Sequence, residues 1–221
     1  MKTLSKATLT FLIFTLLLAC QSDLFAQSSF EGKIVYTITY TDMPAEMKGY
    51  ESMLPKDLTI FMKGNKSRVE QTQMMGKNII VSDMDNKNGF MEMDMAGQKI
   101  RLNISTEDFE KEENIASDIE YVNESKNILG YDCKKAIMKD DSGNVLMTVF
   151  YTNKIINIAQ KEFLGLKGFP LQYRMTQENM TMEMTASDIS KQSISDQSFE
   201  KSAGYKDISQ ADLQKMMMGG M

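Results

Sequence analysis

The sequence contains no histidine and no tryptophan, and only two cysteines and three prolines among its 221 residues. Without histidine, the Ser-His and Cys-His nucleophile pairs, the usual zinc ligand sets and the commonest general base are excluded. The 25 basic and 30 acidic residues leave a net charge of −5. That charge argues against a nucleic-acid partner, because binding a phosphate backbone requires a basic patch. These absences favour a protein that is not an enzyme and that uses no cofactor or metal.

The first residues have the pattern of an export signal. Lys2 and Lys6 precede an uncharged apolar run over residues 7–19, which is too short to span a bilayer because a spanning helix needs about 20 residues. Two cleavage sites compete, one after Ala26 and one before Cys20, where the sequence LLAC resembles a bacterial lipobox and the cysteine would be lipidated. Residues 1–26, or 1–19 for a lipoprotein, are therefore predicted to be removed.

Both cleavage routes predict an exported protein, which would be periplasmic, an outer-membrane lipoprotein or secreted. A lipid on Cys20 would be its only membrane attachment. Either route leaves Cys133 as the single free thiol of the mature chain, so no internal disulfide is expected. We interpret Cys133 as a small buried hydrophobic residue, since no histidine is present to activate it.

Strand signals dominate from about residue 30 to residue 190, in runs of alternating apolar and polar residues such as Ile34-Val35-Tyr36-Thr37-Ile38. Such period-2 runs indicate strands, and turn residues separate them every ten to twelve positions through the first half of the chain. The pattern predicts a mainly β protein: one curled antiparallel sheet or incomplete β-barrel, with short helices at its concave face. No linker or repeat divides residues 27–221, which are expected to form one domain.

Two segments are predicted to be helical. Residues 43–54 follow Asp42 and contain Pro44, and a helix there would bring together an apolar stripe suited to cover the concave face as a lid. The members of this stripe are Met43, Met47, Tyr50 and Leu54. The second helix is predicted from Ser209 to about Met217.

Methionine is the one residue type in surplus, with 21 copies. Two Met-x-Met-x-Met runs each place three thioethers on one face of a strand: Met91, Met93 and Met95 in the first, and Met180, Met182 and Met184 in the second. Three interpretations stay open for these residues: an ordinary core, a deformable wall that lines an apolar ligand, or a Cu(I) site. Glu92 and Asp94 alternate with the first run, and we expect them on a solvated outer face.

One stretch resembles a known family. The residues Ile128-Leu-Gly-Tyr-Asp-Cys-Lys-Lys-Ala136 are followed by Tyr151-Thr152, by the segment 165–171 (GLKGFPL), by Phe199 and by Gly204-Tyr205. That order is similar to the exported bacterial family called domain of unknown function 4412, and to the related GLPGLI-type family. Residues 165–171 depart from the GLPGLI motif by carrying a lysine and a later proline.

The resemblance implies a fold like that of the periplasmic lipoprotein carriers, an incomplete antiparallel barrel whose mouth short helices close. It implies export, but no activity and no catalytic residue. On physical grounds Gly130 is expected to form the turn before a strand over 131–139, and Pro170 to begin a strand.

The sequence therefore predicts a non-catalytic envelope protein that binds an apolar ligand, such as a lipid or an acyl chain, in a concavity lined by methionine and tyrosine. The first alternative is an envelope interaction or structural protein whose concavity is filled by its own side chains. The minor alternative is Cu(I) binding through the Met-x-Met strands.

Overall fold

A computed structural model describes residues 29–47, 49–73, 76–95, 97–108, 118–156, 163, 165–177 and 180–218. The export segment and Cys20 lie outside these residues. Within the described ranges, no helix has the length and apolar character needed to cross a membrane.

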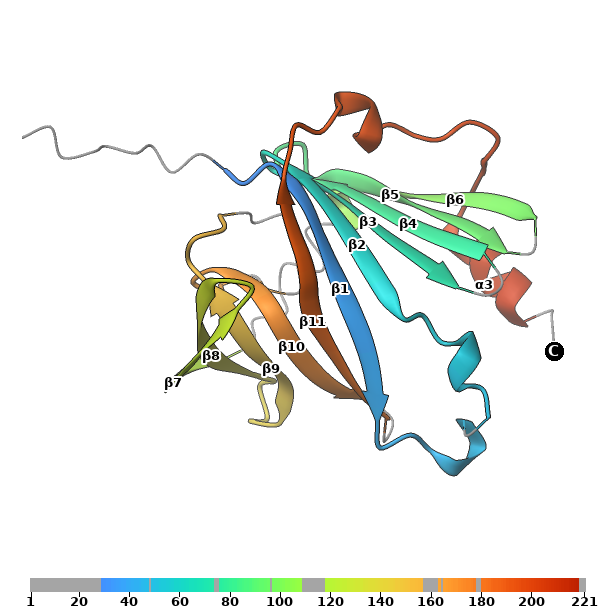
Figure 1. The fold of residues 1–221 in the computed structure, drawn as a ribbon. Coiled ribbons are helices and arrows are strands. Elements are labelled where there is room, and N and C mark those ends of the chain that lie inside the picture. Colours follow the sequence, from blue (N-terminus) through green and yellow to red (C-terminus); the bar gives the residue numbers. More distant parts are fainter. Residues whose placement is uncertain are drawn as a thin grey trace, which may run out of the picture.

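The described residues form one sheet of twelve strands in the order β12-β6-β5-β4-β3-β2-β1-β11-β10-β9-β8-β7 (Figure 1). The strands are β1 Gly32–Thr41, β2 Asp57–Lys63, β3 Lys66–Gln73, β4 Gly76–Asp83, β5 Asn88–Met95, β6 Gln98–Ile104, β7 Asp118–Ile128, β8 Tyr131–Lys139, β9 Val145–Thr152, β10 Phe169–Gln177, β11 Met180–Lys191 and β12 Lys206–Ile208. Neighbouring strands are antiparallel, except that β12 runs parallel to β6.

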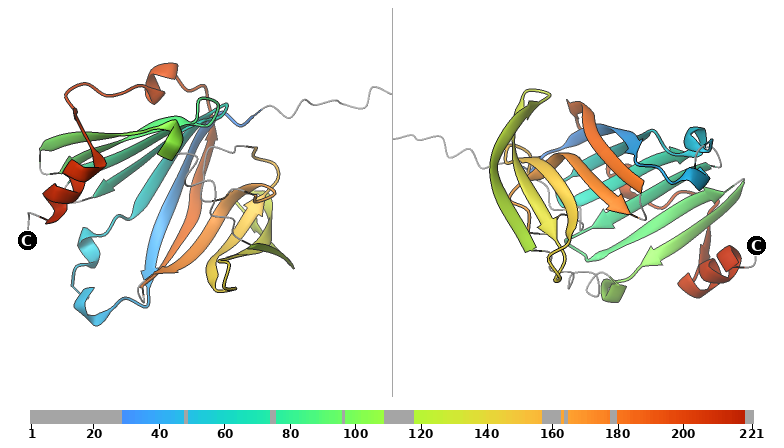
Figure 2. Two further views of the ribbon diagram at one scale, coloured as in Figure 1. Left: turned by 180° about the vertical axis from the view of Figure 1, so that it is seen from behind. Right: turned by 90° about the horizontal axis from the view of Figure 1, so that it is seen from below.

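The sheet is open, because β7 and β12 stand at its two ends in the strand order. Figures 1 and 2 show that it curls, so that β7–β9 and β3–β6 form two arms on either side of β1 and β11. A right-handed twist accumulated over so many strands makes this curl unavoidable. The predicted fold class, a mainly β protein built on one curled antiparallel sheet, is confirmed.

Local sequence explains the junction between β7 and β8. Leu129 and Gly130 both have positive φ angles, +51° and +84°, as a two-residue hairpin turn of type I′ requires. Glycine adopts this conformation without steric cost, and the Asn127 side chain accepts a hydrogen bond from the Gly130 N–H at 3.0 Å. The predicted turn at Gly130 and the strand over 131–139 are both confirmed.

The C-terminal helix prediction is confirmed, and the one for residues 43–54 is wrong. The helix α3 spans Gln210–Met218, and it is capped where Ser209 Oγ accepts a hydrogen bond from the Asp212 N–H at 3.1 Å. The described residues of 43–54 form two separate 3₁₀ turns, η1 Ala45–Met47 and η2 Glu51–Met53. Gly49 lies between them and interrupts the helical repeat, as expected for a residue with low helix propensity.

The broken helix also removes the predicted apolar stripe. Tyr50 is 57% exposed, whereas Met43, Met47 and Leu54 are half-buried. The segment lies beyond the ends of β1 and β2 (Figure 1). It is tied there by a hydrogen bond from the Tyr40 hydroxyl to the Pro55 carbonyl at 2.9 Å. The described residues therefore show a looped connection in place of a lid helix.

The main core fills the concave face where β1 and β2 meet β8–β11. Tyr36 lies at its centre, fully buried, and its hydroxyl donates to the Pro170 carbonyl at 2.5 Å. The Tyr36 ring meets Tyr173 edge to face at 5.9 Å, and Tyr173 in turn meets Phe163 at 5.0 Å. Because Phe163 and Ile155 come from the connection between β9 and β10, that connection helps to fill this half of the concavity.

The main core lies on the concave face of β1 and β2, but a second buried cluster lies on the opposite, outer face of β4 and β5. Strand register places Ile80 on the same face as Ile34, so Ile79 and Val81 lie on the opposite, outer face. Ile79 and Val81 are nevertheless buried, whereas Ile80 is half-buried. The two belong to a second cluster with Phe90, Ile194 and Phe199. The residues after β11 cover the outer face here, including the 3₁₀ turn η4 Asp196–Phe199 (Figure 1).

Candidate functional site

The concave side of β4–β6 carries four apolar side chains that are only half-buried, beside Ile100 of β6, which is buried. Strand register places Met91 directly opposite Ile80 on β4 and Leu102 on β6, and Met93 follows on the same face of β5. We call Ile80, Met91, Met93 and Leu102 the concave stripe; all four are intermediate in exposure. The stripe arises because residues 79–81 and 90–91 are apolar on both strand faces, and among the described residues Ile194 and Phe199 cover the outer one.

The second methionine run lies in a different part of the concavity. Met182 and Met184 on β11 face Tyr40 and Ile38 of β1. Met184 is buried in the main core, Met182 packs against that core, and Met180 is half-buried. The alternation predicted from both runs is confirmed, but Met184 behaves as core rather than as an open wall.

The two runs are not neighbours in the sheet. Four strands, β4, β3, β2 and β1, separate β5 from β11, so no methionine of one run pairs across strands with a methionine of the other. The Met95 side chain lies outside the described residues. Of the methionines in the two runs, Met91 and Met93 are therefore the ones that contribute to the concave stripe.

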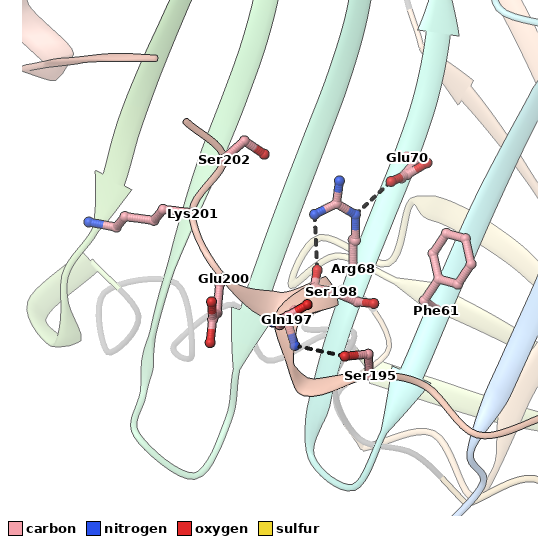
Figure 3. A pocket seen from close by; sticks show the side chains of 9 residues that line it. All are labelled: Phe61, Arg68, Glu70, Ser195, Gln197, Ser198, Glu200, Lys201 and Ser202. Atoms are coloured by element: carbon pink, nitrogen blue, oxygen red, sulfur yellow. Dashed lines mark hydrogen bonds and ion pairs between the residues drawn. The ribbon is translucent and has the colours of Figure 1, made fainter. Parts of the chain in front are cut away.

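A second hollow lies on the outer face, beneath the chain that follows β11 (Figure 3). This pocket has a volume of about 470 Å³, and its floor is the ion pair between Arg68 Nε and Glu70 Oε1 at 2.6 Å. Arg68 also donates to the Ser198 carbonyl at 2.9 Å. Burial alone would raise the pKa of Glu70, but hydrogen bonds from Lys77 and Arg68 outweigh it and lower that pKa. The full lining is Phe61, Arg68, Glu70, Ser195, Gln197, Ser198, Glu200, Lys201 and Ser202.

The pocket is polar and does not match the apolar site that the sequence predicts. Nothing in the sequence signals it, because its floor comes from β2 and β3 and its roof from a segment more than a hundred residues later. Its charged groups are already paired or exposed, and among the described residues no cluster of three or more Cys, Asp or Glu side chains could hold a metal.

The expectation that Glu92 faces solvent is wrong. Glu92 is fully buried, and its Oε1 accepts from Arg101 Nε at 2.9 Å, from Arg101 Nη2 at 2.7 Å and from the Ser202 N–H at 2.8 Å. Arg101 also donates to the Ser202 carbonyl and pairs with Asp207 at 3.3 Å. The physical reason is the same cover over the outer face, which no local pattern around Glu92 reveals.

Cys133 is buried, as the sequence analysis predicts. Burial is the main cause that raises the pKa of its thiol, from an ordinary 9.0 to about 11, with a further contribution from the Asp132 carboxylate. The thiolate fraction at pH 8 therefore falls about 100-fold. Cys133 is accordingly a poor nucleophile in the folded protein.

We expect iodoacetamide at pH 8 to alkylate Cys133 in the native protein at least 100-fold more slowly than in the urea-unfolded protein, because the folded thiol is both protonated and inaccessible. Intact mass against time measures both rates. Equal rates would mean that the strand around Cys133 opens freely and does not belong to the core.

Comparisons with known proteins bear on the fold. No protein-family model and no curated protein matches the chain. Two crystal structures of PNGF-II match 86% of it with a TM-score of 0.54 and 14% identity, and the chain spans about a third of the PNGF-II length, 33% in one and 34% in the other. The lipoprotein LppX of Mycobacterium tuberculosis matches with a TM-score of 0.37, 10% identity and coverage of 86% of this chain and 99% of LppX. The likeness to PNGF-II shows a shared sheet fold.

Proposed function

We propose that the protein is an exported, non-catalytic protein of the cell envelope, of the domain of unknown function 4412 type, that binds an apolar ligand such as a lipid or an acyl chain. The concave stripe is the binding surface in this proposal. The observation that supports it is the contrast between the faces of β4–β6. The outer face is buried under residues that follow β11, whereas on the concave face Ile100 is buried and the four side chains of the concave stripe stay half-buried.

The chemistry of the stripe suits such a ligand. Each Å² of apolar surface removed from water contributes about 25 cal/mol, so an acyl chain lying on half-buried side chains gains free energy without displacing a polar group. Met91 and Met93 have flexible thioether side chains that adapt to ligands of varied shape. The neighbouring Ile80 and Leu102 supply fixed aliphatic surface on either side of Met91.

The self-filled alternative has its own support. Beneath β1 and β8–β11 the described side chains pack the concavity as a core, with Tyr36, Tyr173 and Phe163 among them. In the alternative, the stripe over β4–β6 is a contact surface for another protein. In the Cu(I) alternative, stoichiometric Cu(I) binding persists against a chelator and is lost in Met93→Leu.

The test is binding of a fluorescent fatty acid, 11-(dansylamino)undecanoic acid, to the wild type and to Met91→Ser/Leu102→Ser. We expect the double variant to bind at least tenfold more weakly, because it removes apolar area worth about 2 kcal/mol from the stripe. Half-buried positions should tolerate the change, so thermal stability is expected to fall only slightly.

Val145→Ser/Leu146→Ser is the matched control, because both side chains are exposed on β9 outside the stripe. It should bind the probe as the wild type does. Equal affinities of the stripe variant and the wild type, or no saturable binding by either, would contradict the proposal and favour the self-filled alternative.

A further inference from the structure

The last described part of the chain is attached to the sheet differently from the part before it. Ile194 and Phe199 are buried in the outer-face cluster and anchor residues 192–199 by apolar contact. From residue 200 to residue 216 no side chain is buried. This later stretch passes across the outer face to β6, forms β12 and continues into α3 beside the edge of the sheet (Figures 1 and 2).

Polar contacts around a single arginine hold this stretch in place. Arg101 donates to the Ser202 carbonyl and pairs with Asp207, and the Tyr205 ring lies 5.6 Å from its guanidinium carbon. Glu92, held by the same Arg101, accepts from the Ser202 N–H. Burial, followed by the carboxylates of Glu92 and Asp94, raises the pKa of Tyr205.

The backbone adds little further attachment. β12 has three residues and is the one strand of the described sheet that pairs in parallel, an arrangement slightly less stable per residue than antiparallel pairing. In α3 Leu213 is half-buried, and most other described side chains of the helix are exposed. An isolated nine-residue helix is marginal in water without a packed face.

Detaching this stretch would restore water to a buried ion pair. Among the described residues Glu92 Oε2 has no hydrogen-bond partner although it is buried. Transferring two charges out of water has a large desolvation free energy. The attraction between the charges offsets it only partly when a lone pair has no hydrogen-bond partner. The free energy lost when the polar contacts break is therefore offset in part by hydration of Glu92 and Arg101. The larger apolar side chains that detach, Tyr205, Ile208 and Leu213, are only half-buried.

We propose that residues 200–218 form a releasable strap, attached through the cluster of Glu92, Arg101, Ser202 and Asp207. Release uncovers the edge of β6 and removes Lys201 and Ser202 from the wall of the outer pocket, while Ile194 and Phe199 stay in place. Segments with few buried apolar contacts open below the global unfolding free energy, and the strap meets that description.

Amide hydrogen exchange of the full chain, read by peptide mass spectrometry, tests the proposal. In the wild type we expect residues 200–218 to exchange at least tenfold faster than residues 192–199 and than β1 and β2. Glu92→Gln, which keeps the shape but removes the charge, should accelerate exchange in 200–208 a further tenfold and leave β1 and β2 unchanged.

Glu200→Gln is the matched control, because Glu200 is an exposed carboxylate on the strap outside the Arg101 cluster. It should leave the exchange of 200–218 unchanged. The proposal would be overturned if the wild-type strap exchanged at the same rate as β5 and β6. It would also be overturned if the strap exchanged at the wild-type rate in Glu92→Gln.

If Glu92→Gln does not fold, Ser202→Pro takes its place, because it removes the N–H donor to Glu92 and leaves every sheet residue intact. Fast exchange confined to 200–218 in that variant supports a releasable strap. Loss of protection throughout the chain would mean that the strap folds with the sheet as one cooperative unit, and the proposal would be wrong.

Discussion

Replacing Phe169 by alanine is expected to lower the thermal unfolding midpoint by about 10 °C. Phe169 begins β10 and is 1% exposed within the main core, paired with Thr152 of β9. Truncating a buried phenylalanine costs about 3–5 kcal/mol, because the transfer free energy is lost and a cavity remains. In a domain of this size each kcal/mol shifts the midpoint by roughly 2–4 °C.

Differential scanning calorimetry of the mature chain measures this shift. Val145→Ala is the control, since Val145 lies on the adjacent strand β9 but is 57% exposed, and its midpoint should stay within about 2 °C of the wild type. If Phe169→Ala and Val145→Ala lowered the unfolding midpoint by similar amounts, that result would contradict a core centred beneath β1 and β8–β11.

Replacing Gly168 by alanine is expected to destabilise the protein by about 3 kcal/mol. A Cβ at this position would lie 2.4 Å from the Thr152 carbonyl oxygen and 2.8 Å from its carbonyl carbon. Those atoms belong to the backbone of β9, so they can yield only by shifting the strand, and forced backbone shifts of this kind cost about 1–3 kcal/mol. Gly168 thus allows the close approach of β9 and β10, which explains the second glycine of the 165–171 segment.

Urea denaturation measures this effect against Gly143→Ala. Gly143 has a φ of +82° but nothing within 4 Å of an added Cβ, so it reports the backbone strain alone, about 1 kcal/mol. We expect Gly168→Ala to lose clearly more free energy of unfolding than Gly143→Ala. The reverse order would show that the contact with Thr152 relaxes at no cost.

The strands that the sequence predicts are those whose two faces differ. Residues 131–139 form a strand with the predicted bounds, because alternation of apolar and polar residues is a local property of a half-buried strand. β7 has no such alternation. Its side chains from Asp118 to Asn127 are exposed or half-buried, as expected at a solvated sheet edge. The sequence there has no apolar–polar alternation from which the strand could be predicted.

The helix predicted over 43–54 is wrong although its sequence pattern is clear. The spacing of Met43, Met47, Tyr50 and Leu54 suits a helix, but a helical period stabilises one only when a surface is present to bury the stripe. The described structure places this connection beyond the ends of β1 and β2, where Tyr50 stays exposed. Propensity alone then leaves two short 3₁₀ turns.

The sequence by itself determined the mainly β fold, the turn at Gly130, the C-terminal helix and the methionine faces of β5 and β11, since each depends on residues close together in the chain. Only the tertiary structure decided which face of β4–β6 is buried and that Glu92 is an internal ion. The first outcome depends on Ile194 and Phe199, and the second on Ser202, which lies 110 positions after Glu92 and 101 after Arg101. A strand's period shows that its two faces differ, but the segment that folds over one of them decides which face is inside.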